Sequence, residues 1–338
     1  MNNDVINIGI IGAGGIANSV HLPSLKDIEG INISCICDHI IEKAQSASAK
    51  YNIPNVYDNY KVMIGKEKLD GIFVLVQPDQ IFRIACDTIM NGIHTFIEKP
   101  AGITLYQAES LARIASENSR MLQVGMNRRY IPVIQAVVNK MRKITPITQI
   151  EGCFVKNSEA AFYGGCASAY ICDTIHAIDI ISWIADADAV SAATIVGKVN
   201  SAVDNSWNSV IRFENGIAGI LKANYQTGGR VHTFEIHGPN ASAFVDLGFG
   251  GQSCKGRILH RKGSGSFSIS SAGSGGFEIE ELDGVQLANS SKYYRYYGYY
   301  YEDLEFVNCI KSGKKPLCNI DSALKSMKLA DFILANVI

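Results

Sequence analysis

Residues 5–38, VINIGIIGAGGIANSVHLPSLKDIEGINISCICD, decide the fold of this chain. An apolar run over 5–11 is followed by a glycine turn, a stretch of helical length, and a second apolar run that ends in Asp38. A strand, a turn, a helix and a second strand in this order predict one βαβ unit, which is the building block of a parallel sheet.

The glycine turn of this unit carries GAGGIA at 12–17, which fits the pattern G-x-G-x-x-[GA]. The first glycine permits the tight turn, the second lets the backbone approach a pyrophosphate, and the small last residue lets helix and strand pack. The free N–H groups of the helix start attract phosphates. The pattern therefore predicts a dinucleotide site formed by Gly12, Gly14, Gly15, Ile16 and Ala17.

Asp38 stands at the end of the second predicted strand, 21 residues after Ala17. A carboxylate at this place accepts hydrogen bonds from the adenosine ribose hydroxyls and repels a 2′-phosphate. Residues 39–42 contain no arginine that could hold such a phosphate. The sequence therefore favours NAD over NADP as the cofactor.

Strand-like and helix-like stretches continue to alternate up to about residue 125, which predicts an N-terminal Rossmann domain with a doubly wound parallel sheet. The further strands are expected at 71–76, 93–97 and 121–126, and helices at 79–90 and 105–117.

Beyond residue 125 several strand-like runs follow one another with only short turns, such as Asn215-Gly216. Strands without crossover helices must mostly pair antiparallel, so we expect a C-terminal α+β domain on a largely antiparallel open sheet with helices on one face. The expected domains are 1–124 for the dinucleotide and 125–338 for substrate binding and oligomerisation. The Gly- and Ser-rich stretch 263–276 is interpreted as a loop or hairpin, and helices near 299–311 and 320–337 close the chain.

The bulk composition argues for a small-molecule partner. Among 338 residues, 31 Lys and Arg against 32 Asp and Glu give a net charge of −1, which does not favour nucleic acid or an anionic membrane. No apolar run reaches the roughly 18 residues of a membrane span, so we expect a cytoplasmic protein. The spacing of the nine cysteines does not resemble zinc knuckles, and no metal site is expected.

Glu98-Lys99-Pro100 follows the predicted strand 93–97, at the sheet edge where ligands of open α/β sheets collect. From the pattern alone, Lys99 is as well interpreted as a surface lysine. A lysine beside a cationic nicotinamide would instead have a lowered pKa, which suits it to relay a proton near neutral pH.

A predicted helix carries Cys172, Asp173, His176 and Asp179, which fall within an arc of about 120° at 100° per residue. This polar face would line a cleft. From the spacing alone, a helix with a satisfied histidine and two solvated carboxylates is the simpler interpretation.

Four motifs together resemble the glucose-fructose oxidoreductase and inositol dehydrogenase family over nearly the whole chain. They are the glycine turn, Gln77-Pro78 after a strand, residues 91–94 leading into Glu98-Lys99-Pro100, and GMNRRY at 125–130. Glu98-Lys99-Pro100 is the most specific of these motifs. The resemblance implies a catalytic Lys99 beside the nicotinamide and the substrate hydroxyl, and subunits that pair through the open C-terminal sheet as a homo-oligomer.

The same resemblance implies further site residues. Gln77, Pro78, Glu98 and Lys99 join the cofactor site, and the substrate is expected to meet Lys99, Asn127, Arg128, Asp173 and His176. Members of the family usually have an aspartate four residues before this histidine. Here Cys172 holds that position and the acid is Asp173, so either residue is left as the partner of His176.

These features favour an NAD-dependent oxidoreductase that moves a hydride between a hydroxyl-bearing carbon of a sugar, cyclitol or sugar derivative and nicotinamide. Lys99, His176 and Asp173 would form the catalytic group, in a pocket between the domains. A non-catalytic dinucleotide-binding sensor or regulator is the alternative of a different class, and within enzymes a substrate other than a sugar stays open.

Overall fold

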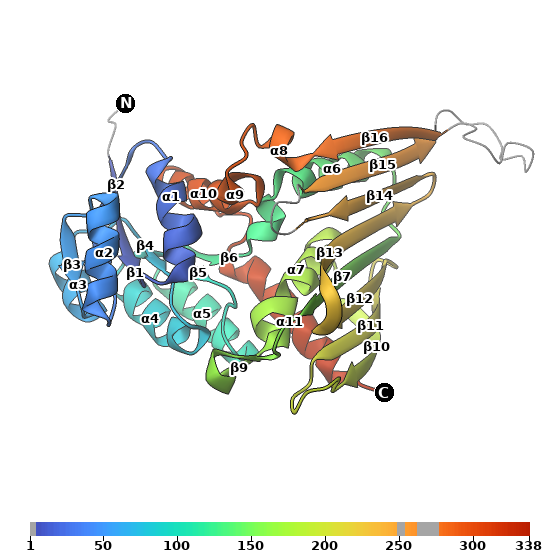
Figure 1. The fold of residues 1–338 in the computed structure, drawn as a ribbon, viewed down its shortest axis with the longest axis horizontal. Coiled ribbons are helices and arrows are strands. Elements are labelled where there is room, and N and C mark those ends of the chain that lie inside the picture. The colour runs from blue at the N-terminus through green and yellow to red at the C-terminus, as the bar shows by residue number, and fades with distance from the viewer. Residues whose placement is uncertain (1–4, 249–253, 262–276) are drawn as a thin grey trace, which may run out of the picture. The chain divides into compact units, whose positions relative to one another are not determined.

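The computed structural model describes residues 5–248, 254–261 and 277–338 (Figure 1). The chain forms two compact units, each assembled from segments that are distant in sequence. The first comprises residues 1–130, 161–175 and 292–328; the second comprises residues 131–160, 176–291 and 329–338. The predicted boundary after residue 124 stays a prediction.

The first unit is built on a six-stranded parallel sheet in the order β3-β2-β1-β4-β5-β6, as its described residues show. The order reverses between β1 and β4, which is the point where doubly wound sheets bind their ligands. The prediction of a doubly wound parallel sheet is therefore confirmed. Its strands are β1 (Ile6–Ile11), β2 (Ile31–Cys37), β3 (Asn55–Tyr57), β4 (Gly71–Val74), β5 (His94–Glu98) and β6 (Leu122–Gly125).

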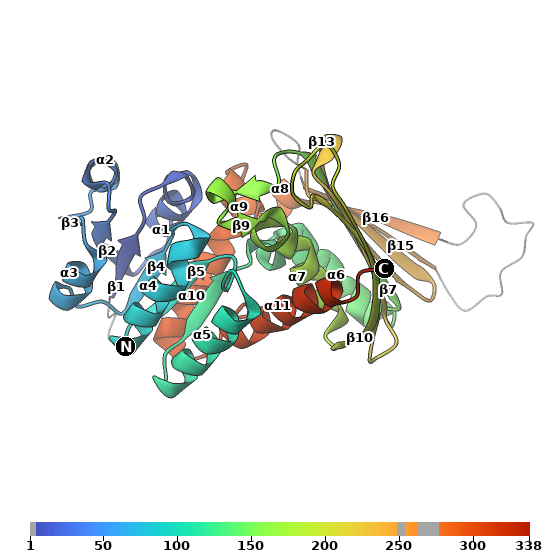
Figure 2. The ribbon, with the colours of Figure 1, turned by 90° about the horizontal axis from the view of Figure 1, so that it is seen from below.

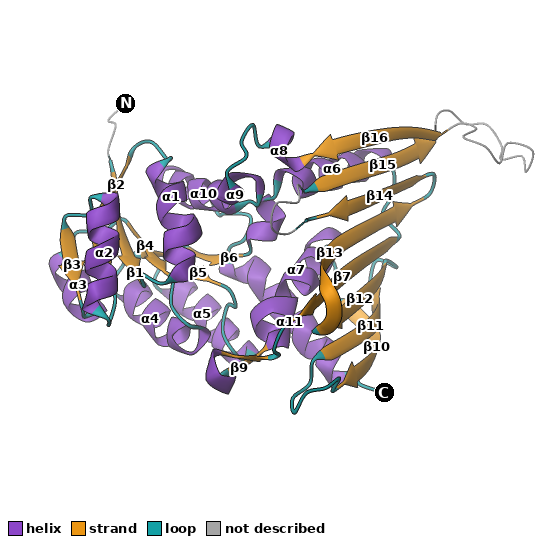
Figure 3. Ribbon diagram, viewed as in Figure 1, coloured by secondary structure: helices purple, strands orange, loops and turns teal. Residues whose placement is uncertain are grey.

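Helices cover both faces of this sheet, because right-handed crossovers in opposite directions from β1 place them on opposite sides (Figures 1 and 3). The connections contain η1 (Ala17–His21) with α1 (Leu22–Lys26), α2 (Ile41–Tyr51), α3 (Tyr60–Lys66), α4 (Pro78–Met90) and α5 (Leu105–Glu117). Shorter elements are η2 (Asn127–Tyr130), β8 (Ala161–Phe162), η3 (Tyr163–Gly165), β9 (Ala167–Ser168) and η4 (Tyr170–Thr174). The chain returns late to this unit with α9 (Tyr293–Tyr296), α10 (Tyr299–Ser312) and the start of α11 (Ile320–Ala335).

Helix α10 closes the apolar core of the first unit. Its Phe306 packs edge-on against Phe73 of β4 and Phe96 of β5, with ring centroids 5.1 and 5.9 Å away. All three side chains are fully buried. Burial of aromatic surface on this scale contributes strongly to folding, so the N-terminal sheet depends on a helix from the end of the chain.

The second unit contains an eight-stranded sheet among its described residues, in the order β10-β11-β12-β7-β13-β14-β15-β16. Every neighbouring pair is antiparallel except β12 and β7, which confirms a largely antiparallel sheet. Its strands are β7 (Gln149–Asn157), β10 (Ala189–Gly197), β11 (Ser206–Phe213), β12 (Ala218–Asn224), β13 (Gln226–Gly238), β14 (Ala241–Asp246), β15 (Lys255–Arg261) and β16 (Phe277–Asp283).

One face of this sheet is covered by α6 (Pro132–Ile144) and α7 (Ile175–Ala185), as Figure 2 shows with the sheet nearly edge-on. Strand β11 alternates buried and exposed residues, so its other face carries outward side chains such as Val210. Val210 is 59% exposed, and Ile195 of β10 and Ile279 of β16 are 60% and 63% exposed. The short α8 (Gly284–Leu287) follows the last strand.

The main differences from the sequence predictions concern short or inconspicuous elements. Strand β3 and helices α2, α3 and α6 were not predicted, whereas the two closing helices are confirmed as α10 and α11. The predicted loop at 263–276 lies outside the described residues. No helix in the described part of the chain is long and apolar enough to cross a membrane.

Candidate active site

The glycine turn after β1 has the geometry that the sequence predicts. Gly12 adopts φ +100°, and a Cβ on it would lie 2.3 Å from the carbonyl oxygen of Leu75, so only glycine fits there. Its N–H donates to the carbonyl of Cys37 at 2.8 Å, which joins the turn to β2. A Cβ on Gly14 or Gly15 would meet no described atom within 4 Å. The turn thus leaves open space beside its backbone, which fits a pyrophosphate.

The chain becomes helical directly after this turn. Ala17 is fully buried, so the small side chain serves the close helix packing that the pattern predicts, and Ile16 lies half-buried before it. The helix is widened to a π-turn over Ala17–His21 before it continues as α1. π-turns of this kind are frequent at functional sites.

Asp38 is buried at the carboxyl end of β2 and holds the glycine turn in place. One carboxylate oxygen accepts the N–H of Ala13 at 2.8 Å, and the other accepts the N–H of Ile40 at 2.9 Å. Each oxygen has a further lone pair for a ribose hydroxyl. The residue therefore fits the predicted NAD contact, and it also has a structural role that the sequence did not suggest.

The other predicted cofactor residues lie at the same carboxyl edge, since all strands of the sheet run parallel. Gln77 precedes the first turn of α4, and Pro78 occupies that turn, where its missing N–H costs nothing. Glu98 ends β5, and one of its carboxylate oxygens accepts the N–H of Lys99 at 3.1 Å.

Lys99 is not a free surface lysine. Its ammonium donates to the carbonyl oxygen of Cys172 over 2.6 Å, which joins the end of β5 to η4 within the first unit. The sequence left Cys172 as a possible partner of His176, whereas the contact to Lys99 is made by the backbone of Cys172. The thiol is buried, and burial raises its pKa to about 11, so it stays protonated at neutral pH.

The predicted polar helix departs from regular α geometry at its start. Residues Tyr170–Thr174 form a π-turn, in which the assumed 100° per residue does not hold, and α7 follows directly. Asp173 lies in this turn in the first unit, whereas His176 and Asp179 lie on α7 in the second unit. Both α7 residues are buried, so Asp179 is not the solvated carboxylate of the simpler interpretation.

Asn127 and Arg128 are both buried in η2. The Asn127 amide donates to the carbonyl of Tyr297 at 2.9 Å, and the Arg128 guanidinium donates to the hydroxyl of the same tyrosine at 3.2 Å. Burial by itself lowers the pKa of Arg128, but Tyr297 and the carboxylate of Asp173 outweigh it and raise the pKa. Arg128 therefore keeps its positive charge although it is buried, and the charge of Asp173 helps to stabilise it.

A contact to Glu98 escaped the sequence analysis. The second Glu98 carboxylate oxygen lies 3.1 Å from Nε2 of His21, a fully buried histidine at the end of the η1 turn. A lone histidine between apolar residues gives no signal in a sequence, because its partners come from other strands and helices.

Comparison with known proteins agrees with this geometry. Residues 6–126 match a family described as an oxidoreductase family with an NAD-binding Rossmann fold, and residues 162–244 match the GFO/IDH/MocA C-terminal domain. The D-apiose dehydrogenase of Paraburkholderia graminis is 24% identical over 64% of this chain and 60% of its own length. The inositol 2-dehydrogenase of Salmonella typhimurium is 24% identical over 59% of this chain and 60% of its own.

The chain thus spans about 60% of the length of these two relatives. Over a longer range, the crystal structure of a dehydrogenase from Chromobacterium violaceum shares the fold, with a TM-score of 0.85 at 19% identity, covering 98% of this chain and 95% of that one. The chain belongs to the GFO/IDH/MocA oxidoreductase family, and its N-terminal part is an NAD-binding Rossmann domain.

Proposed function

We propose that this protein is an NAD-dependent dehydrogenase acting on a hydroxyl-bearing carbon of a sugar, cyclitol or sugar derivative. The observation that carries the proposal is the placement of the Lys99 ammonium at the carboxyl edge of the sheet that holds the glycine turn and Asp38. An ammonium fixed at this edge is suited to proton transfer at a substrate hydroxyl.

NAD supplies the hydride chemistry when it is bound, and this chain's residues supply position and proton transfer. In the proposal, Gly12, Gly14, Gly15, Ile16 and Ala17 bind the dinucleotide with Asp38, Gln77, Pro78 and Glu98. Lys99 holds the substrate hydroxyl and takes its proton, with His176 and Asp173 completing the catalytic group. Asn127 and Arg128 stay predicted substrate residues, and both donate hydrogen bonds to Tyr297.

The wider organisation is part of the same proposal. Residues 1–124 would form the dinucleotide domain and 125–338 the substrate and oligomerisation domain of a cytoplasmic homo-oligomer. The exposed Ile195, Val210 and Ile279 on the uncovered sheet face support association of subunits through that sheet, because an apolar face of this kind gains by exclusion of water.

A panel of cyclitols, sugars, sugar acids and nucleotide sugars, each with NAD and with NADP, tests the activity. We expect reduced nicotinamide to accumulate with NAD and at least one polyol or sugar. The absence of turnover across the panel, together with tight NAD binding, would contradict the enzyme proposal and support the sensor. The relatives named as inositol and apiose dehydrogenases make cyclitols and pentoses the first compounds to try.

Cofactor preference gives a first prediction. The unmodified protein should bind NAD at least tenfold more tightly than NADP, about 1.4 kcal/mol, because Asp38 repels a 2′-phosphate. Asp38→Ala should reduce this difference in affinity between NAD and NADP. It should also make the glycine turn less rigid, since the N–H groups of Ala13 and Ile40 lose their acceptor. Calorimetric titration with NAD and with NADP measures the two affinities. Equal affinities in the parent would refute the assignment of Asp38 to NAD selection.

The partner of His176 gives a second prediction. Asp173→Asn should lower turnover markedly and move the acidic limb of the pH profile to lower pH, because the loss of a negative neighbour lowers a histidine pKa. Cys172→Ala should change little, since it keeps the carbonyl that Lys99 contacts. Turnover profiles from about pH 5 to 9 compare the two. A larger loss in Cys172→Ala would show that the cysteine, and not the aspartate, is the functional neighbour.

A further inference from the structure

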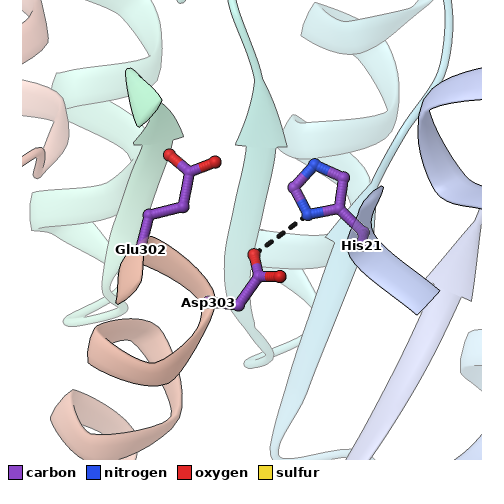
Figure 4. A group of neighbouring side chains, drawn as sticks. All are labelled: His21, Glu302 and Asp303. Carbon is purple, nitrogen blue, oxygen red and sulfur yellow. Dashed lines mark hydrogen bonds and ion pairs between the residues drawn. The ribbon is translucent and has the colours of Figure 1, made fainter. Parts of the chain in front are cut away.

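A cluster of ionisable side chains lies buried behind Glu98 in the first unit. Nδ1 of His21 is 2.9 Å from a carboxylate oxygen of Asp303 (Figure 4). Its Nε2 is 3.1 Å from a carboxylate oxygen of Glu98. Glu302 lies beside this pair at the start of α10. His21, Glu302 and Asp303 are 0% exposed. Charges are excluded from water this completely only when they compensate one another.

The two hydrogen bonds favour the charged form of His21. With Asp303 and Glu98 ionised, a neutral imidazole has only one N–H and cannot donate to both carboxylates, whereas an imidazolium can. Burial by itself lowers the histidine pKa, but Asp303 and Glu98 outweigh it and raise the pKa well above its usual value. Burial and the charge of Asp303 raise the pKa of Glu302 well above its usual value, which favours its neutral form.

The cluster connects to the proposed site through Glu98. One Glu98 oxygen meets His21, and the other accepts the backbone N–H of Lys99, whose ammonium in turn reaches Cys172. A chain of contacts therefore runs from Asp303 on α10 to the lysine that the proposal makes catalytic. Aromatic side chains surround His21: the ring centroids of Phe96 and Tyr299 lie 5.4 and 5.7 Å from that of the imidazole. A low-dielectric environment of this kind strengthens each charged hydrogen bond.

We propose that His21 is a positioning residue: held by Asp303, its imidazolium fixes Glu98, and Glu98 fixes the backbone from which Lys99 reaches its place of action. The inference rests on the proposed function for its consequence in turnover, although the charge of His21 and the order of the Lys99 segment are properties of the free protein.

The same side chains suggest a metal site, because one ligand atom from each of His21, Glu302 and Asp303 lies within 4.8 Å of the others. The contacts favour a proton over a metal ion. Both imidazole nitrogens already lie at hydrogen-bond distance from carboxylates, which leaves neither of them directed at a cation.

The test compares Asp303→Asn and His21→Gln with Asp27→Asn. Asp27 is a matched control because its carboxylate also ties the N-terminal sheet region to the late segment of the chain, through Arg295 at 2.9 Å and Tyr294 at 2.7 Å. Its hydrogen bonds and ion pairs with described residues do not involve Glu98. All three changes should lower the melting temperature. Only the first two should lower kcat, by about tenfold or more, with the NAD Kd within about threefold of the parent.

Two readouts do not need a substrate. In ¹⁵N-histidine spectra of the parent, both His21 ring nitrogens should stay protonated at about pH 8, and one should lose its proton in Asp303→Asn. Hydrogen exchange of the Lys99 amide should accelerate at least about tenfold in Asp303→Asn and His21→Gln but not in Asp27→Asn. If His21→Gln does not fold, the spectra of the parent and of Asp303→Asn still show whether His21 is charged and whether Asp303 keeps it so.

Three results would overturn the inference: a neutral His21 in the parent, unchanged exchange at Lys99, or losses of kcat no greater than in the Asp27 control. One equivalent of metal in the purified protein, lost in Asp303→Asn, would also overturn it in favour of a metal centre. A parent without turnover on any substrate would instead refute the proposed function, while the spectra and the exchange rates still test the positioning.

Discussion

Lys99→Met should lower turnover by about 10² or more and leave NAD binding nearly intact. Methionine keeps the length and apolar stem of lysine but removes the ammonium that donates to the carbonyl of Cys172. The glycine turn and Asp38, which the proposal assigns to the dinucleotide, lie on other strands and keep their geometry. Steady-state turnover with a substrate from the panel, and calorimetric titration with NAD, measure the two effects separately.

Lys43→Met is the control, because Lys43 is an exposed lysine of α2 in the same unit. We expect its turnover and NAD affinity to equal those of the parent. Turnover of Lys99→Met within about threefold of the parent would show that another group relays the proton.

Gly12→Ala should destabilise the protein by about 2–4 kcal/mol and abolish measurable NAD binding. Alanine resists φ +100°, and its Cβ would lie 2.3 Å from the carbonyl oxygen of Leu75, which is main chain and cannot rotate away. The turn must therefore shift, and with it the N–H groups that would face a pyrophosphate. Denaturant unfolding and NAD titration measure the two effects.

Gly14→Ala separates the two causes. A Cβ at Gly14 would meet no described atom within 4 Å, so the stability of this variant should stay within about 1 kcal/mol of the parent. Its NAD affinity should nevertheless fall, because the new methyl group occupies the space beside the backbone that a pyrophosphate needs. Equal NAD affinity in this variant and the parent would place the cofactor elsewhere.

The fold was predictable where a local pattern determines it. The βαβ unit from β1 to β2 follows from apolar runs, a glycine turn and an acid at the strand end, all within 34 residues of sequence. Helix α6 was not predicted, although Pro132 at its start and its buried apolar residues at a helical period would have indicated it. Strand β3 has three residues, too few to show a period.

The candidate site was predictable where an ionisable residue stands at the end of a predicted strand. Asp38 and Lys99 stand at strand ends, and the sheet places both at one edge. The contact partner of Lys99 is a carbonyl, which every residue possesses, so no pattern could single out Cys172 for it. The π-turn over Tyr170–Thr174 likewise could not be foreseen from a projection that assumes regular helix geometry.

The late return of the chain to its first unit has a consequence for synthesis. His21 meets Asp303 only after 282 further residues have been made, and Phe73 and Phe96 meet Phe306 233 and 210 residues after themselves. The N-terminal half of a nascent chain therefore exposes an aromatic surface that is prone to aggregation. It also lacks the Asp303 that holds His21 beside Glu98. Most of the second unit is translated in this interval. The cofactor domain, although first in sequence, is among the last parts of the molecule to be completed.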